Sequence, residues 1–355
     1  MTKVHILTFH RALNYGAILQ CYSLHKTISQ ISECDVIDYR ACCIENRYKV
    51  FVAGKSLKGI IKALLTVPTV KKKRTKFDEF IKNNIEMTQT VNSHDELKRM
   101  SWGESDCFCV GSDQVWNLDL ITGDSSFFFD FVPQEVKRFS YAASIGADLK
   151  EEWKNVFQSY LADFGAVSVR EKTAQKQLNS CGITASIEID PVFLLKREEW
   201  FDKARNINSD SFVLIYLLQK ADSFMKSAIE FAQEHGKKVI IISTGLRRQY
   251  DAEYVSDCGP EEFLGYFKAA DTIFTNSFHG IAFSILFNKQ FYYQMQGNSV
   301  KTNSRLYDII SLFQLEKRNI DNIDNEDYID YSFINTVIEQ KRESAIDYLK
   351  NQIVG

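Results

Sequence analysis

Proline and glycine, which interrupt helices and strands, are scarce in this sequence. It has 4 Pro and 16 Gly among 355 residues, which argues against long disordered linkers. No apolar run approaches the roughly 20 residues that span a bilayer, and the opening MTKVHILTFH lacks the apolar core of a signal peptide. A formal charge of -3 gives no general attraction to nucleic acid. We therefore expect a cytoplasmic globular protein that does not bind nucleic acid.

Cysteine is present without the spacings that would give it a metal or redox role. Among the eight cysteines there is no CxxC pair, and no histidine stands at a zinc-finger spacing from them. We predict reduced, mostly buried thiols that act as small apolar side chains. Scattered His, Cys and carboxylate residues give no metal-ligand pattern, so we expect no metal.

Apolar patterning predicts a chain that alternates strands and helices. A strand over 4–8, a polar turn, a helix over 17–28 and a strand over 34–38 form one βαβ unit, whose sheet should be parallel. Further strands are expected over 106–111, 139–144, 166–169, 212–218, 239–243 and 271–275, and helices over 151–164, 173–180, 221–234, 261–269, 280–287 and 324–353. Because 355 residues are many for one core and a second βα series starts near 212, we expect two domains, 1–185 and 186–355.

Residues 57–76 combine an apolar segment, GIIKALLTV, with a basic one, KKKRTK. A solvated helix face is the simpler interpretation, and peripheral contact with the inner face of a membrane is the alternative.

Polar residues follow several predicted strands directly. In open α/β sheets, ligands bind at the carboxyl ends of strands, so these positions are the first place to look for a site. The stretches are HRALNYGA (10–17), GSDQVWN (111–117), SVREK (168–172), STGLRRQ (243–249) and TNSFHG (275–280).

The stretch TNSFHG has the clearest physical meaning. Asn276, Ser277 and Gly280 surround the start of a predicted helix, whose free backbone N–H groups attract phosphate or carboxylate. His279 could donate to such an anion or transfer a proton near neutral pH. The alternative is that Ser277 only caps the helix and His279 is an ordinary first-turn residue.

Three arginines follow strands as well. The planar fork of Arg170 suits a carboxylate or phosphate, although a surface salt bridge explains it equally simply. Arg247 and Arg248 follow the apolar VIIIS strand, and because adjacent side chains diverge, at most one should face a site.

The two stretches in the first half suggest a sugar site. Asp113 and Gln114 could bind hydroxyls and Trp116 could stack on a sugar ring, with turn capping and core packing as the alternatives. At the other stretch, Asn14 and Gly16 suit a tight loop close to a ligand. There His10, Arg11 and Tyr15 are further candidates, with turn chemistry as the alternative.

Taken together, these stretches resemble a known family. FHRALNYGAILQCYSL, VGSDQVWN, YAASIG, SVREK, DPVFLL and TNSFHGIAFSILF occur in the order seen in polysaccharide pyruvyltransferases, from residue 4 to about 318. The resemblance implies a GT-B-like α/β fold with two Rossmann-like domains facing a cleft and a C-terminal helix. It also implies phosphoenolpyruvate as the donor substrate, a sugar or lipid-linked oligosaccharide as the acceptor, and no cofactor.

The resemblance assigns roles to some residues and leaves others open. The histidine of the family falls on His279 and the arginine of its SVRE motif on Arg170, both associated with donor binding or catalysis. Arg247 and Arg248 lie where a cation could reach the phosphate. The acceptor side varies among members, so the N-terminal loop and Asp113 stay hypotheses.

Two other functions use the same features. A glycosyltransferase that consumes a nucleotide sugar fits the expected scaffold, and so does a glycan-binding protein that catalyses nothing. Stabilisation by phosphoenolpyruvate or by nucleotide sugars, together with phosphate release, distinguishes the three.

Overall fold

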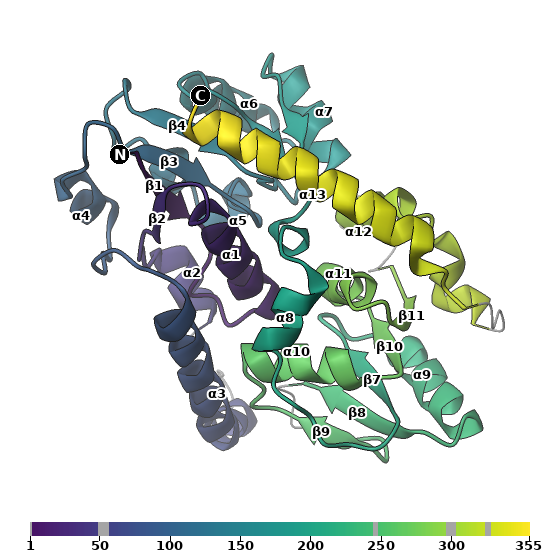
Figure 1. The fold of residues 1–355 in the computed structure, drawn as a ribbon. Helices are drawn as coiled ribbons and strands as arrows, with labels where there is room; N and C mark the ends of the chain where they lie inside the picture. The colour runs from purple at the N-terminus through teal and green to yellow at the C-terminus, as the bar shows by residue number, and fades with distance from the viewer. Residues whose placement is uncertain (1, 49–56, 244–247, 296–302, 324–327) are drawn as a thin grey trace.

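The computed structural model describes residues 2–48, 57–243, 248–295, 303–323 and 328–355. Within these ranges the chain forms two parallel sheets, each flanked by helices (Figure 1). No helix in these ranges is both long and apolar enough to cross a membrane.

The first half contains a four-stranded sheet in the order β2-β1-β3-β4. Its strands are β1 (Lys3–Leu7), β2 (Glu33–Val36), β3 (Cys107–Val110) and β4 (Lys137–Ser140). Two short strands, β5 (Ser168–Val169) and β6 (Ser186–Ile187), pair with each other, and isolated bridges join this pair to the sheet. The helices are α1 (Tyr15–Ile28), α2 (Cys42–Arg47), α3 (Leu57–Asn84), α4 (His94–Arg99), α5 (Leu118–Ile121), α6 (Glu151–Leu161) and α7 (Lys172–Ser180).

The second half contains a five-stranded parallel sheet in the order β11-β10-β7-β8-β9. Its strands are β7 (Phe212–Tyr216), β8 (Lys238–Ile242), β9 (Glu253–Val255), β10 (Thr272–Thr275) and β11 (Gln290–Tyr293). The helices are α8 (Arg197–Lys203), α9 (Asp222–Glu234), α10 (Pro260–Ala269), α11 (Phe278–Leu286), α12 (Ser304–Leu312) and α13 (Tyr331–Ile353). The two Rossmann-like halves give the expected GT-B-like α/β architecture.

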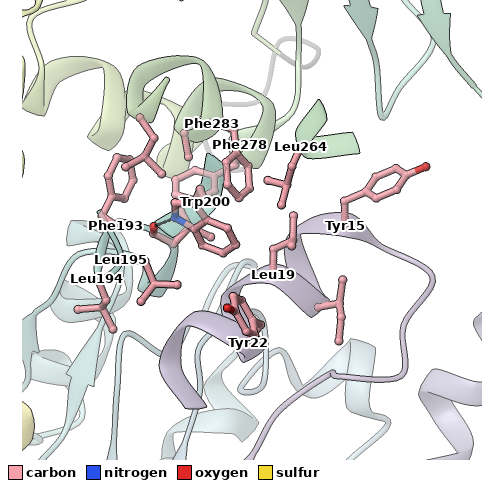
Figure 2. Close-up of a cluster of buried hydrophobic side chains, with 14 of the residues drawn as sticks. Tyr15, Leu19, Tyr22, Phe193, Leu194, Leu195, Trp200, Leu264, Phe278 and Phe283 are labelled. Atoms are coloured by element: carbon pink, nitrogen blue, oxygen red, sulfur yellow. Dashed lines mark hydrogen bonds between the residues drawn. The ribbon is translucent and has the colours of Figure 1, made fainter. Parts of the chain in front are cut away.

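One apolar core continues from the first half into the second. Tyr15 and Tyr22 of α1 face rings of the second half, where Tyr15 stacks on Phe263 at 4.3 Å and Tyr22 meets Trp200 at 5.6 Å between ring centroids. Figure 2 shows this helix lying against Trp200 and Phe283. The halves are therefore held together by buried aromatic surface.

Helix α13 returns from the second half across the first (Figure 1). Near its end, the Tyr348 hydroxyl donates to the Ser140 carbonyl oxygen of β4 over 2.9 Å. Near its middle, the buried Arg342 donates to the carbonyl oxygens of Phe193 and Leu195 over 2.8 and 3.2 Å. The helix begins at Tyr331, later than the sequence pattern predicted, and residues 324–327 lie outside the described ranges.

The basic run of α3 corrects one prediction. Lys73 is buried, and Lys76 reaches Glu262 of α10 over 2.6 Å. Lys72 forms an ion pair with Asp257. The run is therefore solvated only in part: Lys71 and Lys72 are exposed, while Lys73 is buried and Lys72 and Lys76 contact residues of the second half. Contact with a membrane stays a prediction.

The cysteines largely follow the expectation. All eight are free, and six of them are buried; Cys42 is exposed and Cys43 is half-buried.

Candidate active site

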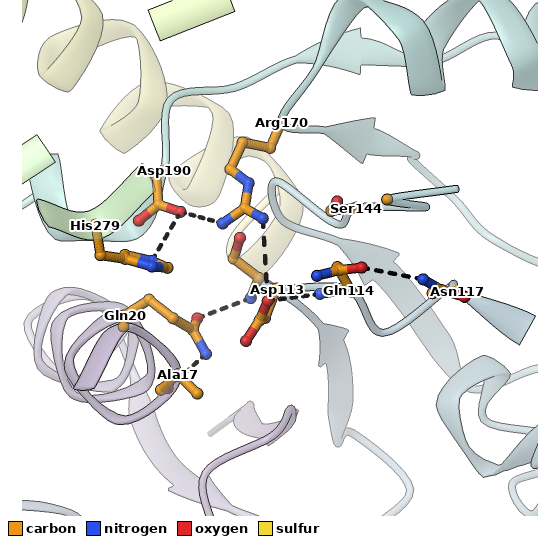
Figure 3. Close-up of polar contacts among 12 residues, drawn as sticks. Ala17, Gln20, Asp113, Gln114, Asn117, Ser144, Arg170, Asp190 and His279 are labelled. Carbon is orange, nitrogen blue, oxygen red and sulfur yellow. Dashed lines mark hydrogen bonds and ion pairs between the residues drawn. The ribbon is translucent and has the colours of Figure 1, made fainter. Parts of the chain in front are cut away.

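The Asp190 carboxylate joins the two side chains that the sequence singled out (Figure 3). Arg170 follows β5 in the first half, and its Nη1 donates to Oδ2 of Asp190 over 2.5 Å. His279 lies in the first turn of α11, and its Nε2 is 3.7 Å from the same oxygen, an ion-pair distance too long for a hydrogen bond. The guanidinium and the imidazole thus come from opposite halves and meet at one carboxylate.

Arg170 has more hydrogen-bonding capacity than its neighbours use. Its guanidinium carbon lies 4.7 Å from the centre of the Phe278 ring, and Asp113 and Glu171 each lie 4.0 Å from one of its nitrogens. Among the described residues, Nε and Nη2 of Arg170 and Nε2 of His279 are buried without a hydrogen-bond partner. Such groups are rare in folded proteins, and here they indicate a place for a polar ligand.

Asp190 and Arg170 hold each other in their charged forms. Burial alone would raise the pKa of Asp190, but the Arg170 guanidinium and the His279 imidazole outweigh burial and hold that pKa well below its ordinary value. Burial disfavours the charge of Arg170, yet Asp190, Glu171 and Asp113 raise its pKa. Oriented buried charges of this kind can bind and stabilise charge in a reacting molecule.

A cavity of about 240 Å³ opens beside Arg170 and includes a second guanidinium, that of Arg305 in α12. Burial lowers the pKa of Arg305, and the neighbouring charge of Arg170 lowers it further. Two guanidinium groups at one small cavity favour a ligand with more than one negative charge. The other charged residues of the wall are Lys172, Glu188, Asp190, Asp308 and Lys341.

Glu188 gives this cavity a carboxyl group that titrates near neutrality. Burial raises the pKa of Glu188 to about 7, against smaller lowering effects from Ser186 and Lys341. A carboxyl with that pKa can hold and release a proton at neutral pH. No sequence pattern distinguishes Glu188 from the other acidic residues, and our sequence analysis missed it.

The imidazole of His279 lies against the first turn of α1. A β-carbon on Gly16 would be only 1.9 Å from its Nδ1, so the close approach requires glycine at this position. Asn14 caps α1, with its Oδ1 accepting from the Gly16 amide over 2.9 Å. Ser277 caps α11 in the same way, accepting from the Gly280 amide over 3.3 Å. Both caps hold the two helix ends in place beside the imidazole.

Comparison with protein families identifies the relatives of this arrangement. The model of the polysaccharide pyruvyl transferase family matches residues 14–293, most of the chain, including Arg170, Asp190 and His279. The chain belongs to the polysaccharide pyruvyl transferase family. Arg305 lies beyond the matched range. A search of curated proteins finds no match.

Solved structures with a similar arrangement of the whole chain are distant in sequence. The UDP-GlcNAc 2-epimerase of Methanocaldococcus jannaschii, in complex with UDP-GlcNAc and UDP, is 11% identical with a TM-score of 0.48, and the match covers 100% of both chains. The corresponding enzyme of Neisseria meningitidis, bound to UDP-GlcNAc, is 9% identical with a TM-score of 0.46, over 99% of this chain and 94% of that chain. An alpha-glucosyltransferase in complex with UDP is 8% identical with a TM-score of 0.45, over 98% and 95%.

Other predicted residues of this pyruvyl transferase family member hold α11 in place. Asn276 accepts from the Leu218 amide over 2.8 Å and donates to the Gln219 carbonyl oxygen over 2.9 Å, which ties the start of α11 to the loop after β7. Gly280 lies so close to Thr275 that a β-carbon would be 2.2 Å from its hydroxyl oxygen. These contacts fix the start of α11 and so hold His279 in place.

Of the predicted sugar-binding residues of the first half, only Asp113 lies beside Arg170. The side chain of Gln114 accepts from Asn117 over 3.0 Å instead. Trp116 is fully buried and donates to the Phe127 carbonyl oxygen, so it belongs to the core and cannot stack on a sugar. His10 and Arg11 both bind Asp38, at 3.1 Å and 2.7 Å.

Tyr15 and Arg248 lie away from Asp190. The Tyr15 hydroxyl donates to the Cys258 carbonyl oxygen over 2.9 Å, and its ring lines a second cavity, of about 490 Å³, together with Asn14. Arg248 donates to the Ser256 hydroxyl over 2.9 Å and stacks on a tyrosine ring at that cavity. Arg247 lies outside the described residues.

Proposed function

We propose that this chain transfers the pyruvyl group of phosphoenolpyruvate to two hydroxyls of a sugar in a cell-surface glycan or its precursor, forming a ketal and releasing phosphate. Family membership supports pyruvyl transfer. The observation that carries the donor assignment is the pair of guanidinium groups, Arg170 and Arg305, at one small cavity beside His279. Phosphoenolpyruvate is small and carries both a carboxylate and a phosphate, and each anion suits a guanidinium fork.

The chemistry needs controlled movement of protons. A proton added to the methylene carbon makes C2 electrophilic, one sugar hydroxyl adds to C2, and the bond from C2 to the phosphate oxygen breaks. The second hydroxyl then adds to C2 and closes the ring. Two hydroxyl protons are lost; one makes up for the proton given to the methylene carbon, and the other leaves with phosphate.

We assign the proton transfer at the sugar hydroxyl to His279, whose Nε2 is buried without a hydrogen-bond partner among the described residues. The Asp190 carboxylate lies 3.7 Å from Nε2 and faces the imidazole from the side of Arg170. We assign the proton given to the methylene carbon to Glu188, which lines the donor cavity and whose pKa of about 7 suits that role. Arg305, Lys172 and Lys341 stand with Arg170 in the wall of this cavity and supply the positive charge for the donor, so we route no step through a metal.

The test follows phosphate release from phosphoenolpyruvate with a panel of sugar acceptors. His279→Ala and Arg170→Ala should each reduce turnover by on the order of a hundredfold or more while the fold survives. Arg205→Ala is the matched control, because Arg205 is an exposed arginine paired with Glu262. In D₂O, the product methyl group should carry one deuterium, which mass spectrometry detects.

Three results would contradict the proposal. Near-normal turnover in either variant would remove that residue from the mechanism. Thermal stabilisation by nucleotide sugars and not by phosphoenolpyruvate would favour the glycosyltransferase alternative. Stabilisation by phosphoenolpyruvate without phosphate release under any acceptor would favour a binding protein.

A further inference from the structure

The cavity beside Tyr15 lies between the two halves, and the proposed binding of phosphoenolpyruvate does not use it. Its volume is about 490 Å³, twice that of the cavity beside Arg170. The carboxyl ends of β7 and β8 form one side, and Asn14, Tyr15, Tyr48 and Lys73 from the first half form the other. In parallel α/β sheets this edge is where ligands bind.

Lys73 differs from every other residue of the basic run in α3. Its side chain is buried with 6% exposed, and its ammonium lies 4.2 Å from the centre of the Tyr15 ring. Its neighbours Lys72 and Lys76 pair with carboxylates, whereas no described residue gives Lys73 a hydrogen bond or an ion pair. A buried ammonium without an anion is costly, so its presence at a cavity points to an anionic ligand.

The protein groups that face Lys73 cannot supply the missing negative charge. The Tyr15 phenol and the Cys258 thiol both lie near Lys73, and burial raises the pKa of both, that of Cys258 to about 12. Both therefore stay neutral at physiological pH. The remaining charged residues along the wall are Lys220 and Asp222, one of each sign.

The start of α9 adds a second feature suited to an anion. This helix of 13 residues begins at Asp222, and its N-cap, Ala221, provides no side-chain cap. Residues 217–222 line the cavity, so the positive end of the helix dipole points toward it. Asp222 weakens this contribution, and we therefore rest the argument on Lys73. Tyr48, Tyr250 and Tyr254 line the same space, and aromatic side chains with a polar end suit a ligand such as a sugar, which has both apolar and polar surface.

We propose that this cavity binds a phosphorylated sugar, with the ammonium of Lys73 on the phosphate and the tyrosine rings around the sugar. The site adjoins the reacting groups, because Tyr15 precedes Gly16, which touches His279. The smaller cavity includes Asp190, which pairs with His279, and the larger one includes Tyr15, the residue before Gly16, so both cavities have a wall residue next to a neighbour of His279. That the phosphorylated sugar is the acceptor rests on the proposed function, whereas its binding at Lys73 does not.

Binding can be measured without any turnover. Isothermal titration should compare glucose 1-phosphate, UDP-glucose and farnesyl-diphosphate-linked glucose with unphosphorylated glucose, in wild-type protein and in Lys73→Met. We expect Lys73→Met to weaken binding of the phosphorylated probes about tenfold or more, with no effect on glucose. Lys71→Met, which removes an exposed lysine of the same helix, is the matched control and should bind as wild type. Lys73→Gln provides a second neutral side chain if the methionine variant does not fold.

The comparison among probes identifies the source of the phosphate. Preference for the farnesyl compound favours a lipid-linked sugar, and preference for UDP-glucose favours a nucleotide sugar; either supports the site. Saturating phosphoenolpyruvate should leave probe binding to the His279→Ala variant unchanged, since this variant should turn over little. Unchanged affinity in Lys73→Met and Lys73→Gln, or competition between the probes and phosphoenolpyruvate, would overturn the proposal while leaving pyruvyl transfer at Arg170 standing.

Discussion

Removing the charge of Lys73 should make the protein more stable at neutral pH. Burial lowers the pKa of Lys73 from 10.5 to about 8, the neighbouring Cys258 opposing this only weakly. A difference of that size between the folded and unfolded states corresponds to about 3 kcal/mol of lost stability while the lysine is protonated. Lys73→Met keeps the apolar stem and removes the charge. It also loses the interaction with the Tyr15 ring, worth about 1 kcal/mol, so the net gain should be about 2 kcal/mol.

The sign of the pH dependence makes the prediction specific. The pKa of Lys73 is lower in the folded protein than in the unfolded chain. Between about pH 8 and pH 10.5 the unfolded chain therefore binds more protons, and the free energy of unfolding of the wild-type protein increases as the pH rises. The advantage of Lys73→Met should therefore be full below pH 8 and shrink toward pH 10.5. Urea unfolding at pH 7 and at pH 10 measures both values, with Lys71→Met expected to change stability by less than about 0.5 kcal/mol at either pH.

A loss of stability in Lys73→Met at pH 7 would refute this reasoning. It would mean that the ammonium is held by a partner in the protein and is a structural anchor between the halves. The predicted result has the opposite meaning: the side chain is retained at a cost in stability, as is common where a residue serves a ligand.

Two further substitutions test the neighbourhood of Asp190. Gly16→Ala would place a β-carbon 1.9 Å from His279 Nδ1, so turnover should fall at least about tenfold. Gly165→Ala is the control and should leave turnover unchanged, because the nearest non-local atom to its β-carbon would be 3.7 Å away. Equal turnover in both variants would show that the position of the imidazole is not critical. Because burial raises the pKa of Glu188 from 4.5 to about 7, its charge opposes folding increasingly as pH rises through that interval. Glu188→Gln should therefore be more stable than wild type by about 1–2 kcal/mol at pH 8, with the gain nearly absent at pH 4.5, as denaturant titration would measure; a gain that is equal at both pH values would exclude the carboxyl charge as its cause.

Apolar periodicity was sufficient to predict most strands and helices, because each depends on which face of a segment is buried. The start of α1 at Tyr15 was predicted late, at 17, because the polar Asn14 and small Gly16 read as a loop while Asn14 in fact caps the helix. The approach of Arg170 and His279 was predictable only in part: each follows the carboxyl end of a parallel strand, where ligands bind, but the two strands belong to different halves of the chain.

Other parts of the site depend on tertiary contacts that local patterns do not contain. Arg305 lies in a helix that no predicted strand precedes, and it comes near Arg170 only because α12 packs against α7 and α11. The inward position of Lys73 did leave a signal: Phe77 and Phe80 follow it at helical spacing on the buried face of α3. A run of basic residues conceals such a signal, because composition alone does not show which one turns inward.

The return of α13 has a consequence for the reacting groups. Arg342 grips the carbonyl oxygens of residues 193 and 195, only a few positions after Asp190, and Lys341 of the same helix lines the donor cavity. A change in how this helix lies across the molecule would shift the carboxylate that aligns the imidazole and, at the same moment, reshape the space for the donor. Substitutions on the outer surface of α13, far from His279, can thus change the alignment of the catalytic groups.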